Sequence, residues 1–347
     1  MAGRQLAAPL LAMRPLSSTA APAKWAQLPE PEAAGDAGLV QVFTRACASG
    51  NGDIGLIALR QPAAMNALTA DMGNAFGEAL ASLVTPGDGR VPVRAVVLCG
   101  APPDGDVAGM LDPAARDEAA AAASTSGRRP PPAAFSAGGD LAFLDNRLDT
   151  APADNVAIMR RFYARFLRPL RECPVPTIAA INGHAVGAGL AISLGCDIRL
   201  AADSARMGLN FVKLGIPPGM GSTFLLQQAV GPQVAARLLL TGDLVDAATA
   251  KSYGLVLDTY PLDKVVQSAV SLAENIAGGS PYAVRATVKA LRTHVDHPST
   301  SLELALEREA LTQAAAYAGG DLALGLKSIR EKSKDSLVFP EWRDPTE

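Results

Sequence analysis

The sequence has few of the side chains that bind metals or carry redox chemistry. It contains four cysteines and three histidines in 347 residues. Cys47, Cys99, Cys173 and Cys196 are far apart, without CxxC spacing and without a histidine at metal-site spacing. We therefore expect reduced thiols in a reducing compartment, and no bound metal.

Long apolar runs and an excess of positive charge are also missing. No apolar stretch reaches the ~18 residues that a membrane-spanning helix needs, and the net charge is -3. We therefore expect no membrane span and no nucleic-acid partner. Hydrophobic residues make up 49% of the chain and charged residues 19%. These proportions predict a large buried core, and the length permits one or two domains.

Acidic residues are absent before Glu30, whereas Arg4, Arg14 and Lys24 lie among alanines and hydroxyl residues. This composition is typical of an organellar targeting segment. We expect residues 1–29 to be a disordered transit peptide. It would direct the protein to the mitochondrial matrix, or alternatively to a plastid. An ordinary disordered N-terminus is the competing interpretation.

The pattern that follows alternates strands and helices. A Gly-Asn-Gly-Asp turn predicts a hairpin between strands at 40–46 and 54–59. A helix capped by Thr69 follows, and then a buried strand at 94–99. Residues 101–132 are rich in proline, glycine and alanine, which predicts a disordered insertion without chemistry of its own.

The second half of the chain is predicted to be mainly helical around two strands. The strands are expected at 177–181 and 197–201, with a last short strand at 255–258. Helices are expected at 155–171, 221–229, 233–240, from the N-cap Asp246 to Gly254, and at 262–277, 282–292, 301–317 and 321–333.

Two glycine-rich turns carry the main chemical signal. Gly187-Ala188-Gly189 lies between a β-type run and an apolar helix, and Gly138-Gly139 forms a similar turn upstream. Small residues let the backbone approach a ligand, and the N–H groups that open a helix point outward. One N–H from each turn would form a two-donor hole for a carbonyl oxygen that becomes an oxyanion.

Six segments resemble the enoyl-CoA hydratase/isomerase (crotonase) family in its order. They are RQP with NAL at 60–68, FSAGGDL at 135–141, INGHAVGAG at 181–189, CDIRLAAD at 196–203, LGIPPGMGST at 214–223 and LTGDLVDAATAKSYGLV at 240–256. The resemblance implies an α/β fold, a spiral of ββα units over 38–260. A C-terminal helical region, 261–347, would form homotrimers or hexamers, or alternatively fold over its own core.

The resemblance also assigns ligand contacts. The hole donors would be the backbone N–H groups of Gly139 and Ala188. Coenzyme A, present only as part of an acyl-CoA substrate, would contact Ala64, Asn66, Ala67, Leu68, Phe135, Ala137, Gly138, Asp140 and Leu141. No permanent cofactor is expected. There is no Walker-type loop, and Ile192 stands where a dinucleotide fingerprint needs glycine.

The sequence departs from the family at the acids. Hydratases of this family use two glutamates, but Ala191 and Phe211 occupy these positions, and Gly219 occupies a third acid position. Together with Gly187 these residues are expected to line a dry pocket. None of their side chains can transfer a proton.

Other groups are weak substitutes for these acids. We expect Asp140 to stabilise its own loop, His184 to be a packed or partly exposed residue at a strand end, and Asp145 and Asp149 to be solvated. Lys213 and Ser222 lie in the loop that normally bears the second glutamate. Ser193 lies inside a buried helix without the preceding glycine of a nucleophile elbow, so a serine hydrolase is not expected.

The sequence therefore predicts a protein that handles acyl-CoA and stabilises a thioester enolate. Hydration or isomerisation of an enoyl-CoA, in fatty-acid or amino-acid catabolism, is one reading. A hydrolase or decarboxylase is an alternative, and so is a catalytically silent acyl-CoA binder or structural subunit of an organellar complex.

Overall fold

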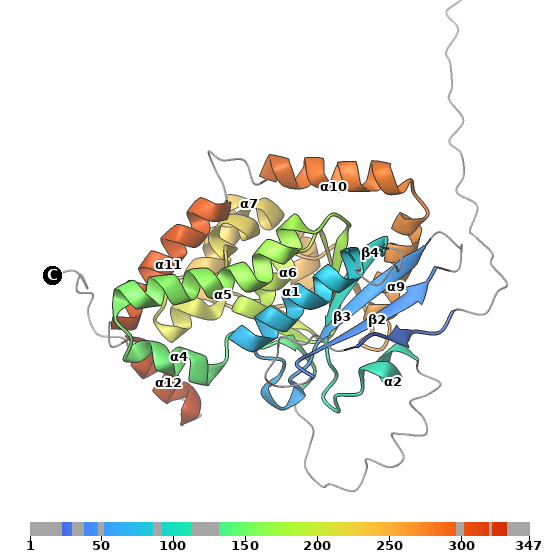
Figure 1. Ribbon diagram of the computed structural model, residues 1–347. Coiled ribbons are helices and arrows are strands. Elements are labelled where there is room, and N and C mark those ends of the chain that lie inside the picture. Colours follow the sequence, from blue (N-terminus) through green and yellow to red (C-terminus); the bar gives the residue numbers. More distant parts are fainter. Residues whose placement is uncertain are drawn as a thin grey trace, which may run out of the picture.

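The computed structural model describes residues 23–29, 38–47, 52–85, 92–112, 132–295, 302–318 and 321–331. These segments form an α/β fold of two β-sheets surrounded by helices (Figure 1). The predicted fold class is confirmed.

The larger sheet has seven strands in the described residues. Its spatial order is β1 (Ala26–Gln27), β2 (Val40–Ala46), β3 (Asp53–Leu59), β4 (Ala95–Gly100), β6 (Thr177–Ile181), β8 (Ile198–Ala202) and β11 (Asp258–Tyr260). The predicted hairpin of β2 and β3 is antiparallel, and from β3 to β11 the strands are parallel. Every residue of β4 is buried, because the strand lies between two parallel neighbours and under helices.

A second sheet of four short strands lies beside the first in the described chain. It contains β10 (Val245–Asp246), β9 (Arg206–Gly208), β7 (His184–Val186) and β5 (Ala134–Ser136) in that order. This sheet was not predicted from the sequence, because strands of two or three residues are too short to show an alternating pattern.

The chain alternates between the two sheets in a repeated pattern. β4, β6 and β8 lie in the first sheet, and each is followed by a strand of the second sheet, β5, β7 or β9. A helix then returns the chain to the first sheet. This repeat is the predicted spiral of ββα units.

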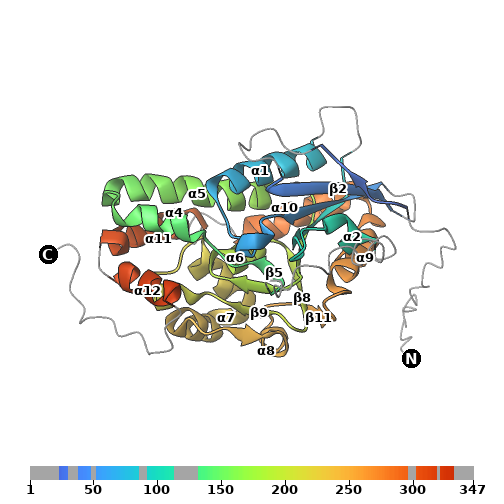
Figure 2. The same ribbon diagram turned by 90° about the horizontal axis from the view of Figure 1, so that it is seen from below.

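Helices cover the sheets and connect their strands. They are α1 (Ala70–Val84), α2 (Val107–Leu111), α4 (Leu141–Leu148), α5 (Pro152–Glu172), α6 (Ala188–Gly195), α7 (Ser222–Thr241), α8 (Ala247–Ser252) and α9 (Val265–Ala277), with 3-10 turns η1 (Pro62–Ala64) and η2 (Asn210–Leu214). As predicted, the Thr69 side chain caps α1, accepting from Met72 N–H at 3.1 Å. α1 and α9 lie on opposite faces of the larger sheet (Figure 2). Gly231, with φ 75°, and Pro232 break α7 into the two helices predicted there.

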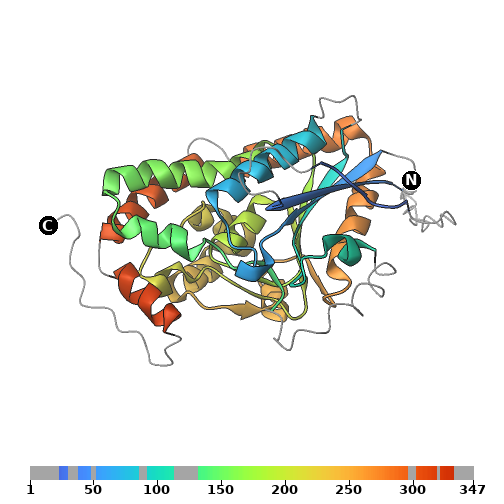
Figure 3. The same cartoon turned by 60° about the horizontal axis from the view of Figure 1, so that its bottom comes forward.

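Three further helices end the described chain, α10 (Pro281–Val295), α11 (Leu302–Ala318) and α12 (Asp321–Arg330). α11 packs along α5, and α12 packs against α4 and η2 (Figures 1 and 3). In the described chain these two helices therefore pack against the preceding helices, and the predicted trimer or hexamer stays a prediction.

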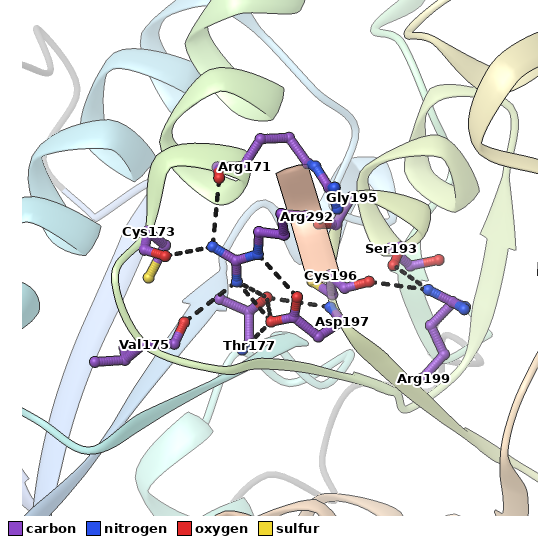
Figure 4. A network of polar contacts seen from close by, with 10 residues as sticks. All are labelled: Arg171, Cys173, Val175, Thr177, Ser193, Gly195, Cys196, Asp197, Arg199 and Arg292. Atoms are coloured by element: carbon purple, nitrogen blue, oxygen red, sulfur yellow. Dashed lines mark hydrogen bonds and ion pairs between the residues drawn. The ribbon is translucent and has the colours of Figure 1, made fainter. Parts of the chain in front are cut away.

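Arg292, a buried side chain of α10 that is 5% exposed, anchors this helix through polar contacts (Figure 4). Its Nε and Nη2 donate to the two carboxylate oxygens of Asp197 at 2.8 and 2.6 Å. Its other N–H groups donate to the carbonyls of Arg171, Cys173 and Val175. Burial opposes ionisation of Asp197, but the hydrogen bonds and charge of Arg292 prevail and lower the pKa of this carboxyl.

Three boundaries differ from the prediction. Within the predicted transit peptide, β1 pairs with β2 and Trp25 lies 5.0 Å from the Arg45 guanidinium, so the end of that segment belongs to the fold. The predicted insertion begins with an ordered helix, α2, capped by Asp106. The rest of that insertion, 113–131, lies outside the described residues. The last strand begins at Asp258, because Leu255 and Val256 pack into the core instead of pairing.

Candidate functional site

Two neighbouring strands bring the glycine turns together. β5 and β7 are parallel neighbours in the small sheet, with Ala134 opposite His184 and Ser136 opposite Ala185. The carboxyl ends of parallel neighbours meet at one edge of a sheet. Each strand ends in one of the two turns, so the topology places Gly139 and Ala188 at the same edge.

The two turns interlock so closely that side chains are excluded. Gly138 has φ 99°, and a Cβ there would lie 2.7 Å from the Val186 carbonyl oxygen and 3.4 Å from Ala188 N. A Cβ on Gly189 would lie 2.3 Å from the Ser136 carbonyl oxygen. These glycines are therefore required by close backbone approach.

The two predicted donors face one cavity. Gly139 and Ala188 both line it, and neither backbone N–H donates to a backbone group elsewhere in the described residues. Ala188 is the first residue of α6 and does not have positive φ, so its methyl group leaves the N–H free to point out of the helix. The positive end of the α6 dipole adds to its attraction for an oxyanion.

The cavity has a volume of about 120 Å³. Most of its wall is apolar and comes from α4, α5, η2 and the loop after η2. The lining residues are Ala137, Gly138, Gly139, Leu141, Phe143, Leu144, Met159, Phe162, Tyr163, Gly187, Ala188, Asn210, Phe211, Leu214, Ile216, Gly219, Met220, Gln313 and Tyr317. No carboxylate, histidine, lysine or arginine is among them.

The three family acid positions lie differently around this cavity. Phe211 and Gly219 line it, as predicted, whereas Ala191 is fully buried in α6 and is not a lining residue. A Cβ on Gly219 would lie 2.6 Å from Gln313 Nε2 and 2.7 Å from the Tyr163 hydroxyl oxygen. The space that an acid at position 219 would enter is therefore already filled by polar atoms from α5 and α11.

These atoms belong to a buried cluster that sequence reasoning missed. The Tyr163 hydroxyl donates to Gln313 Oε1 at 2.6 Å, and the Tyr317 hydroxyl lies 3.3 Å from the same oxygen. Gln313 Nε2 donates to the Pro217 carbonyl at 2.8 Å. Burial raises the pKa of Tyr163 and that of Tyr317, so both hydroxyls stay protonated. We call Tyr163, Gln313 and Tyr317 the amide–phenol cluster.

Glu309, one helical turn before Gln313, is the acid nearest to this cluster in the α11 sequence. Its carboxylate accepts from the N–H groups of Gly221 and Thr223, at 2.5 and 3.0 Å, and from the Thr223 hydroxyl at 2.6 Å. It therefore caps the start of α7. Burial raises the pKa of Glu309 to about 7 despite these donors. Glu309 is not a lining residue of the cavity.

Three of the candidate substitutes have ordinary structural partners. Asp140 caps α4, accepting from Phe143 N–H at 3.0 Å. His184 Nδ1 accepts from Arg206 N–H at 3.1 Å on the small sheet. The Ser193 hydroxyl is fully buried and donates to the Leu190 carbonyl at 2.7 Å. The structural readings of Asp140 and His184, and the buried position of Ser193, are confirmed.

The other four candidates also lie outside the cavity lining. Lys213 pairs with Asp243 at 2.8 Å, and the Ser222 hydroxyl donates to the Gly219 carbonyl at 2.6 Å. Asp145 pairs with Arg330 of α12 instead of being fully solvated. Asp149 ends α4 and is exposed.

The predicted coenzyme A segments are brought together by backbone pairing. Leu68 N–H donates to the Gly138 carbonyl at 2.7 Å, and Asp140 N–H donates to the Leu68 carbonyl at 3.1 Å. The Asn66 amide is buried and donates to the carbonyls of Ala101 and Ala134. Its side chain therefore holds these segments together, and the Phe135 ring lies in the core. Coenzyme A contacts at these positions remain a prediction.

No cluster of side chains that could hold a metal ion occurs in the described part of the chain. The four cysteines are free and buried, and burial raises the pKa of Cys99 and of Cys196 to about 12. None of the helices within the described ranges has the length and apolarity needed to cross a bilayer.

Comparisons with known proteins agree with the geometry. A family model described as enoyl-CoA hydratase/isomerase matches residues 114–337. The 2,3-dehydroadipyl-CoA hydratase of Escherichia coli K12 is 36% identical over 182 residues, which cover 52% of this chain and 69% of that protein. The crotonyl-CoA hydratase of Syntrophomonas wolfei is 31% identical over 205 residues, covering 59% and 76%. A crystal structure of an enoyl-CoA hydratase/isomerase from Pseudoalteromonas atlantica T6c is similar with a TM-score of 0.62 and 26% identity, covering 83% of this chain and 96% of that one.

Proposed function

The chain belongs to the enoyl-CoA hydratase/isomerase family, and we propose that it binds an acyl-CoA thioester whose carbonyl oxygen lies between the N–H groups of Gly139 and Ala188. The observation that carries this proposal is that these two donors, from neighbouring turns, line one largely apolar cavity. As the thioester becomes an enolate, negative charge grows on that oxygen. Each donor then contributes about 3 kcal/mol of stabilisation.

Coenzyme A would extend from the hole along the two backbone segments around Ala64–Leu68 and 135–141. The pairing of Leu68 with Gly138 and Asp140 supports this path, because it brings the segments to the edge where the hole lies. The acyl group would enter the cavity between Phe143, Phe162 and Phe211.

The reaction is constrained by what lines the cavity. General acid–base groups typically contribute about 10²–10⁴-fold each to proton transfer, and no described lining residue is a carboxylate or a histidine. We therefore propose hydration or isomerisation of an enoyl-CoA at a rate far below that of a relative with both glutamates. The same observation favours a second candidate, a catalytically silent acyl-CoA binder.

The test compares Ala188→Pro with Ala188→Gly. Proline is tolerated at the first position of a helix but has no N–H, whereas glycine keeps the donor. Calorimetry with a panel of acyl-CoAs measures binding, and mass spectrometry measures turnover of crotonyl-CoA. We expect Ala188→Pro to lower turnover about 10²-fold or more and Ala188→Gly to change it little. Free coenzyme A, which lacks the thioester carbonyl, should bind both variants equally.

The outcomes separate the candidates. Binding with turnover that depends on the Ala188 N–H supports an enzyme. Binding without any turnover supports the silent binder. If no acyl-CoA binds the wild-type protein, the acyl-CoA proposal is wrong.

We also propose that the protein assembles as a homotrimer or hexamer. Tyr282 and Leu291 on α10 are 83% and 61% exposed and offer apolar side chains for contact with another subunit. Light scattering on the purified protein measures the mass, and a monomer at micromolar concentration would contradict this proposal.

The proposed location is the mitochondrial matrix. The support is the basic, acid-free sequence before Glu30. Because β1 pairs with β2, cleavage of a targeting segment before Trp25 would leave the larger sheet whole. Fusing residues 1–22 to a fluorescent protein tests whether they are sufficient for import, and a cytosolic signal would contradict the proposal.

A further inference from the structure

The amide–phenol cluster supplies three of the four polar side chains among the lining residues of the cavity, and Asn210 supplies the fourth. Tyr163, Gln313 and Tyr317 are at most 2% exposed, and all three line the cavity beside the apolar wall of Phe143 and Phe162. Burying three polar side chains at the wall of an acyl pocket has a cost unless they are hydrogen-bonded. Their partners therefore decide what the cavity can accept.

The orientation of the Gln313 amide follows from its partners. The Pro217 carbonyl can only accept a hydrogen bond, so the amide atom 2.8 Å from it must be the nitrogen. The amide oxygen then faces the hydroxyls of Tyr163 and Tyr317, which can both donate to it. The Tyr163 oxygen also accepts the Met220 N–H.

This arrangement leaves polar capacity unused at the cavity wall. The amide nitrogen has two N–H groups, and one of them donates a hydrogen bond to the Pro217 carbonyl oxygen. No hydrogen bond of the second is present among the described residues. The Tyr317 hydroxyl, besides pointing its hydrogen toward Gln313 or the Met159 sulfur, keeps lone pairs that can accept. The cluster therefore offers one donor and one acceptor side by side.

Glycine at position 219 uncovers the amide. A Cβ there would lie 2.6 Å from Gln313 Nε2, so any larger residue would displace the amide from the wall. The residue that removes a family acid from this loop thus makes room for a neutral hydrogen-bonding group.

We propose that the cavity selects a short acyl group that carries a neutral oxygen, as a keto or hydroxyl group, at a distance from the thioester. The oxygen accepts the second Gln313 N–H, and the hydrogen of a hydroxyl group is donated to Tyr317. This inference rests on the proposed function, because the same hole must hold the thioester. A terminal carboxylate is disfavoured, because no cationic side chain is among the lining residues and burying an unpaired charge is expensive. The guanidinium of Arg147, which is not a lining residue, lies over the Phe143 ring.

The test uses four thioesters with the same number of non-hydrogen atoms. They are 4-methylpentanoyl-CoA, 4-oxopentanoyl-CoA, 4-hydroxypentanoyl-CoA and succinyl-CoA, and the same series is prepared one methylene longer. Calorimetry measures the dissociation constant of each. We expect the oxo and hydroxy thioesters of at least one series to bind about tenfold more tightly than the methyl compound, the effect of about one buried hydrogen bond. The carboxylate should bind most weakly.

Two variants assign the effect to residues. Gln313→Met keeps the approximate shape and should abolish the advantage of both oxygen-bearing compounds over the methyl compound. Tyr317→Phe should reduce the advantage of the hydroxy compound alone. The readout is the ratio of affinities within one variant, so general loosening of the fold, which weakens all four ligands together, leaves it unchanged. Thermal unfolding measures whether each variant is folded.

The binding series can contradict selection of an oxygen-bearing acyl group while acyl-CoA binding itself still holds. Equal binding of the methyl and oxo compounds in both series overturns it, and so does tightest binding of the carboxylate. Unchanged ratios in the two folded variants overturn the residue assignment. If Gln313→Met does not fold, the affinity ratios of the wild-type protein and of Tyr317→Phe still decide whether the cavity selects an oxygen-bearing acyl group. Failure of every thioester to bind the wild-type protein would instead be failure of the proposed function.

Discussion

α10 and α11 are both held to the core by buried polar side chains, but the two anchors differ in charge and in completeness. Arg292 of α10 is charged, and all of its N–H groups have acceptors. Gln313 of α11 is neutral, and one of its N–H groups keeps no acceptor among the described residues. The Arg292 anchor lies where β6 and β8 begin, away from the cavity lining, whereas Gln313 lines it. A complete network stabilises the fold, while an incomplete one beside a cavity has capacity left for a ligand.

The largest effect on stability is expected for Arg292→Met. The substitution leaves Asp197 buried without its cation, and losing one partner of a buried ion pair costs about 3–5 kcal/mol. Chemical denaturation should show this loss, whereas acyl-CoA affinity at a temperature where the variant is folded should be unchanged. Arg285→Met, on the same helix but less buried than Arg292, is the control and should cost less than about 0.5 kcal/mol. A change in ligand affinity would contradict the purely structural role of Arg292.

Two carboxyl groups that hold these helices, Asp197 for α10 and Glu309 for α11, should respond to pH in opposite directions. Asp197 has a lowered pKa, so its contribution is present above its unfolded value of 3.8 and is lost as the pH falls. Glu309, which joins α11 to α7, has a pKa raised from 4.5 to about 7. Its contribution is greatest below 4.5 and is lost as the pH rises through about 7, a difference of about 3 kcal/mol.

The prediction for Glu309 is tested by measuring the free energy of unfolding of the wild-type protein and of Glu309→Gln between pH 4.5 and 7. The wild-type protein should lose stability between pH 4.5 and 7 relative to the variant, because the amide does not titrate. Parallel curves for the two proteins would show that Glu309 titrates at its ordinary pKa.

A smaller effect is expected for Tyr163→Phe. Removing the hydroxyl leaves the Met220 N–H and one lone pair of Gln313 Oε1 without a partner, which costs about 1–3 kcal/mol. Tyr253→Phe is the matched control, because its hydroxyl accepts from Arg237 at the surface and should contribute little. Equal unfolding midpoints for the two variants would mean that the amide–phenol cluster does not hold α11 in place.

Much of the fold could be predicted from local sequence. The Thr69 cap, the hairpin of β2 and β3 and the Gly231-Pro232 break each follow from a few neighbouring residues. The small sheet could not be predicted in this way, since β5, β7 and β9 have three residues each and owe their pairing to the spiral. Yet this sheet is what brings the two glycine turns to one edge.

The part of the candidate site that consists of backbone turns could be predicted from the sequence. The part that consists of side chains far apart in the sequence could not. The glycine motifs pointed to Gly139 and Ala188, which line one cavity. Tyr163 and Gln313 are far apart in sequence, and nothing local links them. The available signal was the row Glu309, Gln313 and Tyr317 at four-residue spacing, in line with the buried Ala310 and Ala314. Polar residues on the buried side of a helix indicate partners elsewhere in the fold.

The separation in sequence between the glycine turns and α11 affects the order of synthesis. The two predicted donors, Gly139 and Ala188, are synthesised long before Gln313 and Tyr317, which complete the cavity wall. At about 5–20 residues per second, the gap is on the order of ten seconds. During this time α4 and α5, which carry Phe143 and Phe162, lack the helix that packs against them. Until α11 has been synthesised, the emerging chain therefore exposes apolar surface of α4 and α5, and the cavity wall is complete only when Gln313 and Tyr317 have joined it.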